Sequence, residues 1–130
     1  MPNKVKMQNQ YGIAYPVIFA AVLAKDTLVR ITANETVDAA AATHRVKGYV
    51  VKSATAINGK GTVMLRGQAV VEVKLSANLA AGIEVKMAAN DGSGNQQVAA
   101  FVEGTDAEAL KVGWLLKGGN NGDIGLVALY

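Results

Sequence analysis

The fold is decided by a stretch that occurs twice: LAKDTLVRITAN at residues 23–34 and LAAGIEVKMAAN at residues 79–90. Two further blocks repeat in the same order. GYVVK at 48–52 returns as GWLLK at 113–117, and GTVML at 61–65 returns as GLVAL at 125–129. A unit that cannot bury its apolar face alone is stabilised by packing against a copy of itself. The sequence therefore predicts two β-units, at about residues 23–65 and 79–129, folded around one shared core.

Short runs of alternating or β-branched residues, separated by Gly and Asn, predict an all-β domain. The expected strands cover residues 17–23, 27–32, 49–53, 62–65, 69–75, 83–87, 98–103, 112–117 and 124–129. Residues 35–45 include four consecutive alanines and predict a helical turn or a loose loop. A second helical turn is expected after Thr105, because Thr105 and Glu108 have the spacing of a capping box. We expect one β domain over residues 17–130.

The first 16 residues differ from the rest of the chain. Residues 1–25 contain three lysines and no acid, whereas the other 105 residues carry ten basic and ten acidic side chains. Pro16 disfavours a helix before it, and the apolar residues alternate as in a strand laid on a surface. We therefore expect residues 1–16 to form an extended, cationic arm that contacts another protein. Lys4, Lys6, Tyr11 and Tyr15 are its candidate binding residues.

Composition argues against several kinds of function. The 130 residues contain no Cys, which leaves no disulfide, thiolate metal site or cysteine nucleophile. Two arm lysines do not make the basic stripe of a nucleic-acid-binding protein, and the apolar runs are too short for a transmembrane helix. A cleaved signal peptide is disfavoured because cleavage after residue 24 would remove the start of the first repeat. We expect no cofactor, no nucleic acid and no membrane partner.

No motif predicts catalysis. His44 is the single histidine and lacks partners at metal-ligand or triad spacing, so a hydrogen-bonded or exposed loop position is expected. Residues 91–95 resemble the start of a calcium loop, but the required later Gly and Glu are missing, and a hairpin turn fits better. Residues 58–62 are likewise predicted to be a turn. Glu72, Glu84 and Glu103 are expected on solvated faces beside lysines. Tyr49 and Trp114 occupy equivalent repeat positions and are interpreted as core residues.

The order of these blocks resembles a known family. RGQAVVEV at 66–73, LAAGIEV at 79–85 and VGWLL at 112–116 carry the likeness, together with VRITAN at 29–34 and RVKGYVV at 45–51. The pattern is similar to the small all-β capsid decoration (cement) proteins of tailed bacteriophages, over roughly residues 17–130. The resemblance implies a β-barrel of the β-clip or β-tulip type, without catalytic residues.

In this family the protein forms homotrimers and binds the major capsid protein on the outer surface of the expanded capsid. The resemblance therefore implies a non-enzymatic protein that stabilises the virion. Two alternatives remain open. A small-molecule or carbohydrate-binding β-clip module is one, because fold does not fix function. A subunit of another virion shell or appendage is the other.

Overall fold

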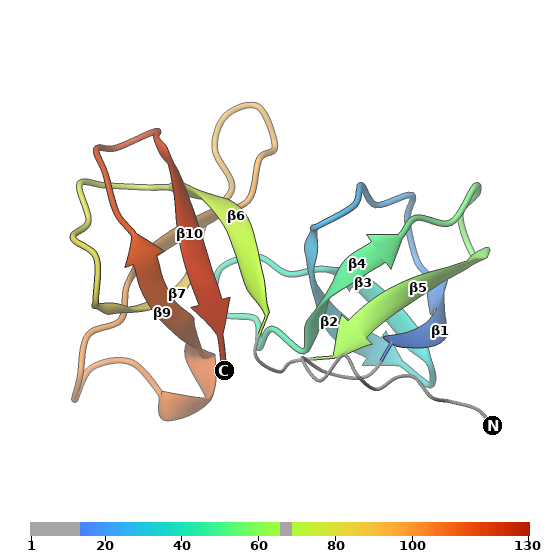
Figure 1. Ribbon diagram of the computed structural model, residues 1–130. Helices are drawn as coiled ribbons and strands as arrows, with labels where there is room; N and C mark the ends of the chain where they lie inside the picture. The colour runs from blue at the N-terminus through green and yellow to red at the C-terminus, as the bar shows by residue number, and fades with distance from the viewer. Residues whose placement is uncertain (1–13, 66–68) are drawn as a thin grey trace, which may run out of the picture. The chain divides into compact units, whose positions relative to one another are not determined.

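The computed structural model describes residues 14–65 and 69–130, which form two closed five-stranded barrels (Figure 1). The strands of the first barrel are β1 (Ala14–Phe19), β2 (Leu28–Ala33), β3 (Thr36–Ala39), β4 (Gly48–Lys52) and β5 (Lys60–Leu65). Those of the second are β6 (Val70–Leu75), β7 (Glu84–Ala88), β8 (Gln97–Ala100), β9 (Lys111–Lys117) and β10 (Ile124–Leu129). A 3-10 turn, η1 (Glu108–Leu110), precedes β9. The all-β prediction is confirmed.

The two barrels have the same topology. Around the first barrel the order is β1-β3-β2-β4-β5, and around the second it is β6-β8-β7-β9-β10. Each barrel contains one parallel pair, β1 with β3 and β6 with β8, while its other neighbouring strands are antiparallel. The repeat read from the sequence is therefore a repeat of structure, and it extends to β1 and β6, which the sequence comparison did not include.

The duplicated units do not build the single shared core that the repeat predicted. Each barrel closes on itself and fills its own interior, and the described core residues are all apolar. The first core is a cluster of Val17, Phe19, Leu23, Val29, Val37, Val50, Ala54 and Val63. A small barrel is filled by its own inward side chains, so five short strands rich in Val already bury enough apolar surface.

Two glycines at equivalent positions let the strands pack closely. A Cβ at Gly48 would lie 2.3 Å from the Met64 carbonyl oxygen, and one at Gly113 would lie 2.1 Å from the Ala128 carbonyl oxygen. Real side chains do not approach a carbonyl this closely, so both positions require glycine. The same residue is used for the same purpose in both halves of the chain.

The segment around residues 35–45 is predicted to be a helical turn or a loose loop; its first part is a strand instead, and a loop follows from Ala40. Thr36–Ala39 forms β3, and no helical turn is present there. Val37 is buried between β1 and β2, and pairing with both strands outweighs the helix preference of the alanines that follow. The next residues, Ala40–Val46, belong to the compact unit of the second barrel rather than to that of the first.

The expected arm of residues 1–16 lies mostly outside the described residues. Its last three residues form the start of β1, which pairs with β5 from Ala14 onward. Pro16 is tolerated inside this strand because the N–H groups of Ile18 and Ala20 point towards β3. Because backbone N–H groups alternate along a strand, the nitrogen of Pro16 also faces the β3 side. Pairing with β3 begins only at Ile18, so the N–H group that proline lacks is not needed for a hydrogen bond between these strands. No helix within the described residues is long and apolar enough to cross a membrane.

Candidate functional site

The candidate arm residues are only partly placed by the structure. Lys4, Lys6 and Tyr11 lie outside the described residues. Tyr15 lies on β1, with 43% of its surface exposed, at one end of the first barrel. The predicted contact surface thus includes a residue that is part of the barrel, because Tyr15 is the second residue of β1.

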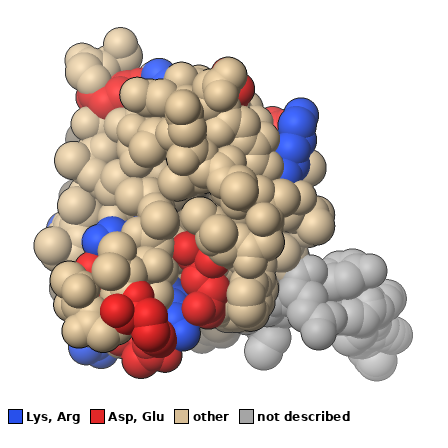
Figure 2. All heavy atoms as spheres, turned by 90° about the vertical axis from the view of Figure 1, so that its left-hand side faces the viewer, with Lys and Arg blue, Asp and Glu red and all other residues tan. Residues whose placement is uncertain are grey.

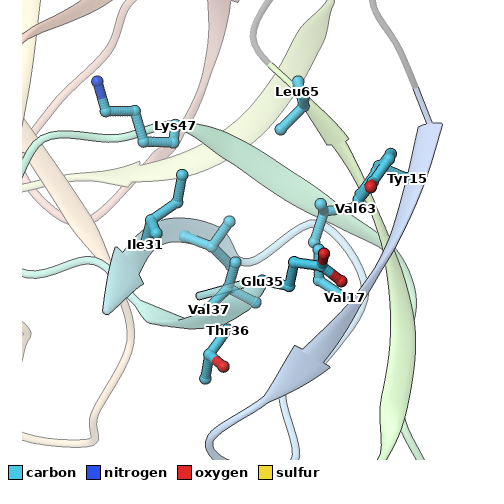
Figure 3. Close-up of a pocket in the computed structure, with 10 residues that line it drawn as sticks. Tyr15, Val17, Ile31, Glu35, Thr36, Val37, Lys47, Val63 and Leu65 are labelled. Atoms are coloured by element: carbon cyan, nitrogen blue, oxygen red, sulfur yellow. The ribbon is translucent and has the colours of Figure 1, made fainter. Parts of the chain in front are cut away.

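Beside Tyr15 the first barrel is hollowed by a cavity of about 230 Å³. Its lining comes from the starts of β1 and β3, from Val29 and Ile31 of β2, from the end of β5 and from Lys47 just before β4. The lining residues are Tyr15, Val17, Val29, Ile31, Glu35, Thr36, Val37, Lys47, Val63 and Leu65. Figure 3 shows the apolar side chains converging on this space from the surrounding strands. We call this end of the barrel the socket.

The socket is apolar inside and carries charge only at its rim. Ile31 is 56% exposed although it shares the inward face of β2 with the buried Val29. Glu35 and Lys47 are exposed at the edge, and the Lys47 ammonium points away from the apolar side chains (Figure 3). Such a surface fits an apolar protein segment, and its volume of about 230 Å³ is smaller than the roughly 300–1,000 Å³ of most small-molecule pockets.

The second barrel carries an exposed cluster of aromatic and charged side chains. Trp114 is 49% exposed and meets the Tyr130 ring edge to face, with centroids 5.9 Å apart. The Tyr130 hydroxyl donates a hydrogen bond to the Glu84 carboxylate, which also pairs with Lys111 at 3.2 Å. Lys111 lies 5.0 Å from the centre of the Phe101 ring.

The interpretation of Trp114 as a core residue is wrong. Its neighbours Gly113 and Leu115 are buried, and strand alternation places the indole between them on the outer face of β9. Its counterpart Tyr49 is half-buried. A single sequence cannot tell which face of a strand turns outward when both faces carry apolar residues, as Leu115 and Leu116 do here.

The ionic contacts of this cluster are coupled. The hydrogen bond from Tyr130 lowers the pKa of Glu84, and Lys111 lowers it further. Partial burial, together with the hydrogen bond to Glu84, raises the pKa of Tyr130 to about 12. Pairing with Glu108 at 2.8 Å, and with Glu84, raises the pKa of Lys111. All three groups therefore keep one protonation state near neutral pH, which suits a fixed surface better than proton transfer.

The loop that resembles a calcium site is held by a lysine instead. The Asp91 carboxylate accepts hydrogen bonds from the backbone N–H groups of Ser93 and Asn95 and pairs with Lys74 at 2.6 Å. The lysine contact, and then the Asn95 contacts, hold the pKa of Asp91 well below its usual range. The hairpin-turn prediction is confirmed. The described residues contain no group of three or more metal-ligating side chains.

The other loop predictions also have clear outcomes. His44 accepts a hydrogen bond at Nδ1 from the Ala41 N–H, as expected of a hydrogen-bonded loop histidine. The turn at Thr105 is not a capping box, because η1 begins after Ala107 without a side-chain cap. Asp106 instead accepts a hydrogen bond from the Val102 N–H and pairs with Lys86 at 2.7 Å.

Figure 2 shows acidic and basic side chains gathered at the lower part of one face, beneath a largely uncharged area.

Sequence comparison places the chain in no known family: no protein-family model matches it, and no curated protein matches it. A comparison of structures finds similarity to the base, at the N-terminal part, of the head fiber protein gp8.5 of bacteriophage phi29. The two share 12% sequence identity with a TM-score of 0.58 over 91% of this chain and 93% of the other. The likeness in fold thus extends over most of this chain and most of the phage head fiber base.

Proposed function

We propose that this protein is a non-enzymatic structural component of a bacteriophage virion that decorates and stabilises the outer surface of the capsid. The observation that carries the proposal is the likeness of both barrels to the base of a phage head fiber, at nearly full coverage of each chain. The sequence resemblance to capsid cement proteins points independently to the same particle. Fold alone does not fix function, so the surface chemistry must fit as well.

The described surface fits a protein that acts by binding. Among the described residues no polar or charged side chain is buried in the core, and three carboxylates, Glu84, Asp91 and Asp106, are held in ion pairs with lysines. The socket and the Trp114 cluster expose apolar and aromatic area of the kind enriched at protein interfaces. The proposed partners are the major capsid protein and further copies of this chain, in a homotrimer.

The arm is the proposed grip on the capsid. Lys4 and Lys6 supply positive charge, and Tyr11 and Tyr15 supply contact area at low entropic cost. Each arm alone need not bind tightly, because three arms on one trimer raise the overall affinity by about a hundredfold or more. Attachment through lysines is expected to weaken as salt is raised.

Co-sedimentation with purified capsid shells tests the proposal. We expect saturable pelleting with expanded, undecorated shells and none with unexpanded shells. If the protein stays in the supernatant with both, capsid decoration is refuted. A variant with Lys4→Glu and Lys6→Glu should pellet less, whereas the double variant Lys52→Glu and Lys60→Glu, at two exposed strand ends, is the matched control for charge.

The base of a head fiber is the second candidate, and the structural comparison favours it directly. A decoration protein saturates the repeated capsomer sites of a shell, whereas a fiber base occupies only its own attachment points. The number of copies bound per shell at saturation therefore separates the two. Negative-stain images would show either an even layer or discrete projections.

The exposed Trp114 favours one further candidate, a carbohydrate-binding surface. An exposed indole beside Tyr130 and the Glu84 carboxylate offers an apolar platform with a polar edge, as sugar rings require. Titration with candidate sugars, followed by Trp114 fluorescence, tests this reading. An unchanged spectrum across a panel of mono- and oligosaccharides rejects it.

A further inference from the structure

The socket of the first barrel has a counterpart in the second barrel that is closed. Four exposed or half-exposed socket residues match buried residues at equivalent positions, whereas Glu35 and Thr36 match the half-buried Gln96 and Gln97. The four, Tyr15, Ile31, Lys47 and Leu65, correspond to Val71, Met87, Val112 and Leu129. The same end of the same fold is thus open in one repeat and closed in the other.

What closes this end in the second unit is the segment Ala40–Val46. It belongs to that compact unit, and both Ala40 and Val46 are fully buried there. The Gln96 side chain, which precedes β8 as Glu35 precedes β3, donates a hydrogen bond to the Ala40 carbonyl at 2.8 Å. The segment that follows the third strand of one repeat therefore seals the barrel of the other repeat.

The chain carries a second segment of this kind at residues 101–106, which follows β8 as Ala40–Val46 follows β3. Its backbone turn is built in the same way. The Val102 N–H donates a hydrogen bond to the Asp106 carboxylate at 2.8 Å, just as the Ala41 N–H donates one to the His44 ring. Unlike Ala40, however, the apolar residues of this second segment are only partly covered, Phe101 by Lys111. Val102 is 48% exposed and Phe101 is only partly buried.

We propose that the socket of the first barrel receives residues 101–106 of a second copy of this chain, so that copies assemble head to tail. The contact repeats between chains the relation that Ala40–Val46 already has to the second unit within one chain. A head-to-tail contact closes into a ring when its rotation permits, which accords with a small cyclic oligomer. The socket rim carries both Lys47 and Glu35, and Lys47 has the charge opposite to that of Glu103, which is exposed beside Val102.

Cross-linking between single-cysteine variants tests the contact, since the chain has no cysteine of its own. Ile31→Cys and Val102→Cys proteins are mixed, treated with a short bis-maleimide, and separated on a denaturing gel. We expect cross-linked pairs in the mixture at a level about tenfold above either variant alone. Ile57→Cys mixed with Val102→Cys is the matched control, because Ile57 is 64% exposed on the same barrel but does not line the socket.

Sedimentation velocity of the full chain gives an independent readout. Ile31→Asp should weaken self-association about a hundredfold or more, because a carboxylate would be buried in an apolar socket, whereas Ile57→Asp should leave it unchanged. A monomeric wild-type protein, or equal cross-linking in the control mixture, overturns the proposal. The proposal is also overturned if association is lost only when residues 1–13 are removed, because the arm would then be the segment that binds in the socket. None of these outcomes depends on capsid binding, so failure here is distinct from failure of capsid decoration; a monomeric wild type would also contradict the proposed homotrimer, whereas equal cross-linking in the control would not.

Discussion

At the scale of single residues, the two repeats form equivalent turns with different amino acids. Asp26 and Asn58 have positive φ values of 71° and 65° in the first repeat, and their counterparts Gly82 and Gly122 both have 92°. Asn and Asp are the side chains that best tolerate this left-handed conformation, and glycine adopts it without strain. The first repeat therefore keeps its turns with polar residues where the second uses glycine.

Gly82→Ala should destabilise the protein by about 1–2 kcal/mol, because alanine is strained at a φ of +92° although the space around the position is open. Urea unfolding measures the change. Gly92→Ala is the matched control, since that position is equally open and its φ does not lie in the left-handed region. The control should be neutral or slightly stabilising. Equal losses in both variants would contradict a cost that arises from the backbone.

Asp91 predicts a dependence of stability on pH. Its folded-state pKa lies below the unfolded value, so its contribution is fully present above about pH 4 and is lost as the pH falls towards the folded pKa. Asp91→Asn removes this contribution. The urea midpoint of the variant should lie below that of the wild type at neutral pH, and the gap should narrow as the pH is lowered from about 5 to about 2. A gap that is constant with pH would assign the loss to the altered turn rather than to the charge.

At the scale of strands, the sequence predicted most of the elements and their repetition, because aliphatic runs between Gly and Asn turns leave few alternatives. It missed β3, whose strand is only four residues long and runs into alanines. The counterpart β8 was expected, since its Ala99 and Ala100 follow Val98 without a longer alanine run. Trp114 was misplaced because alternation says that neighbouring residues face opposite sides, not which side is the interior.

Gly113→Ala tests the packing that both repeats share. The new Cβ would lie 2.1 Å from the Ala128 carbonyl oxygen, so β9 and β10 must move apart, at a cost of about 1–3 kcal/mol or more. The thermal midpoint should fall accordingly. Gly92→Ala, at an open position, again serves as the control. A Gly113→Ala protein with the wild-type midpoint would show that this strand pair has more room than the structure gives it.

At the scale of the whole molecule, the sequence could not show that its repeats close separately. Both arrangements, one shared core and two small barrels, bury the same alternating residues, and only the pairing of β1 with β5 and of β6 with β10 distinguishes them. The socket was equally hidden. Its residues come from five separate places in the chain, and Ile31 and Met87 read alike as strand residues although one is exposed and the other buried.

Two closed barrels with separate cores should be able to lose stability separately. Trp114 is the single tryptophan and lies on the second barrel, so its fluorescence reports that barrel, whereas far-ultraviolet circular dichroism reports the strands of both. Gly48→Ala, whose Cβ would lie 2.3 Å from the Met64 carbonyl oxygen, disturbs only pairing within the first barrel. Its circular dichroism transition should move to lower urea ahead of the Trp114 transition. In Gly113→Ala the order should reverse, because the second barrel is then the weaker one. Transitions that stay coincident in both variants would mean that the barrels unfold as one cooperative unit, with the buried Ala40–Val46 segment as the physical link between the halves of the chain.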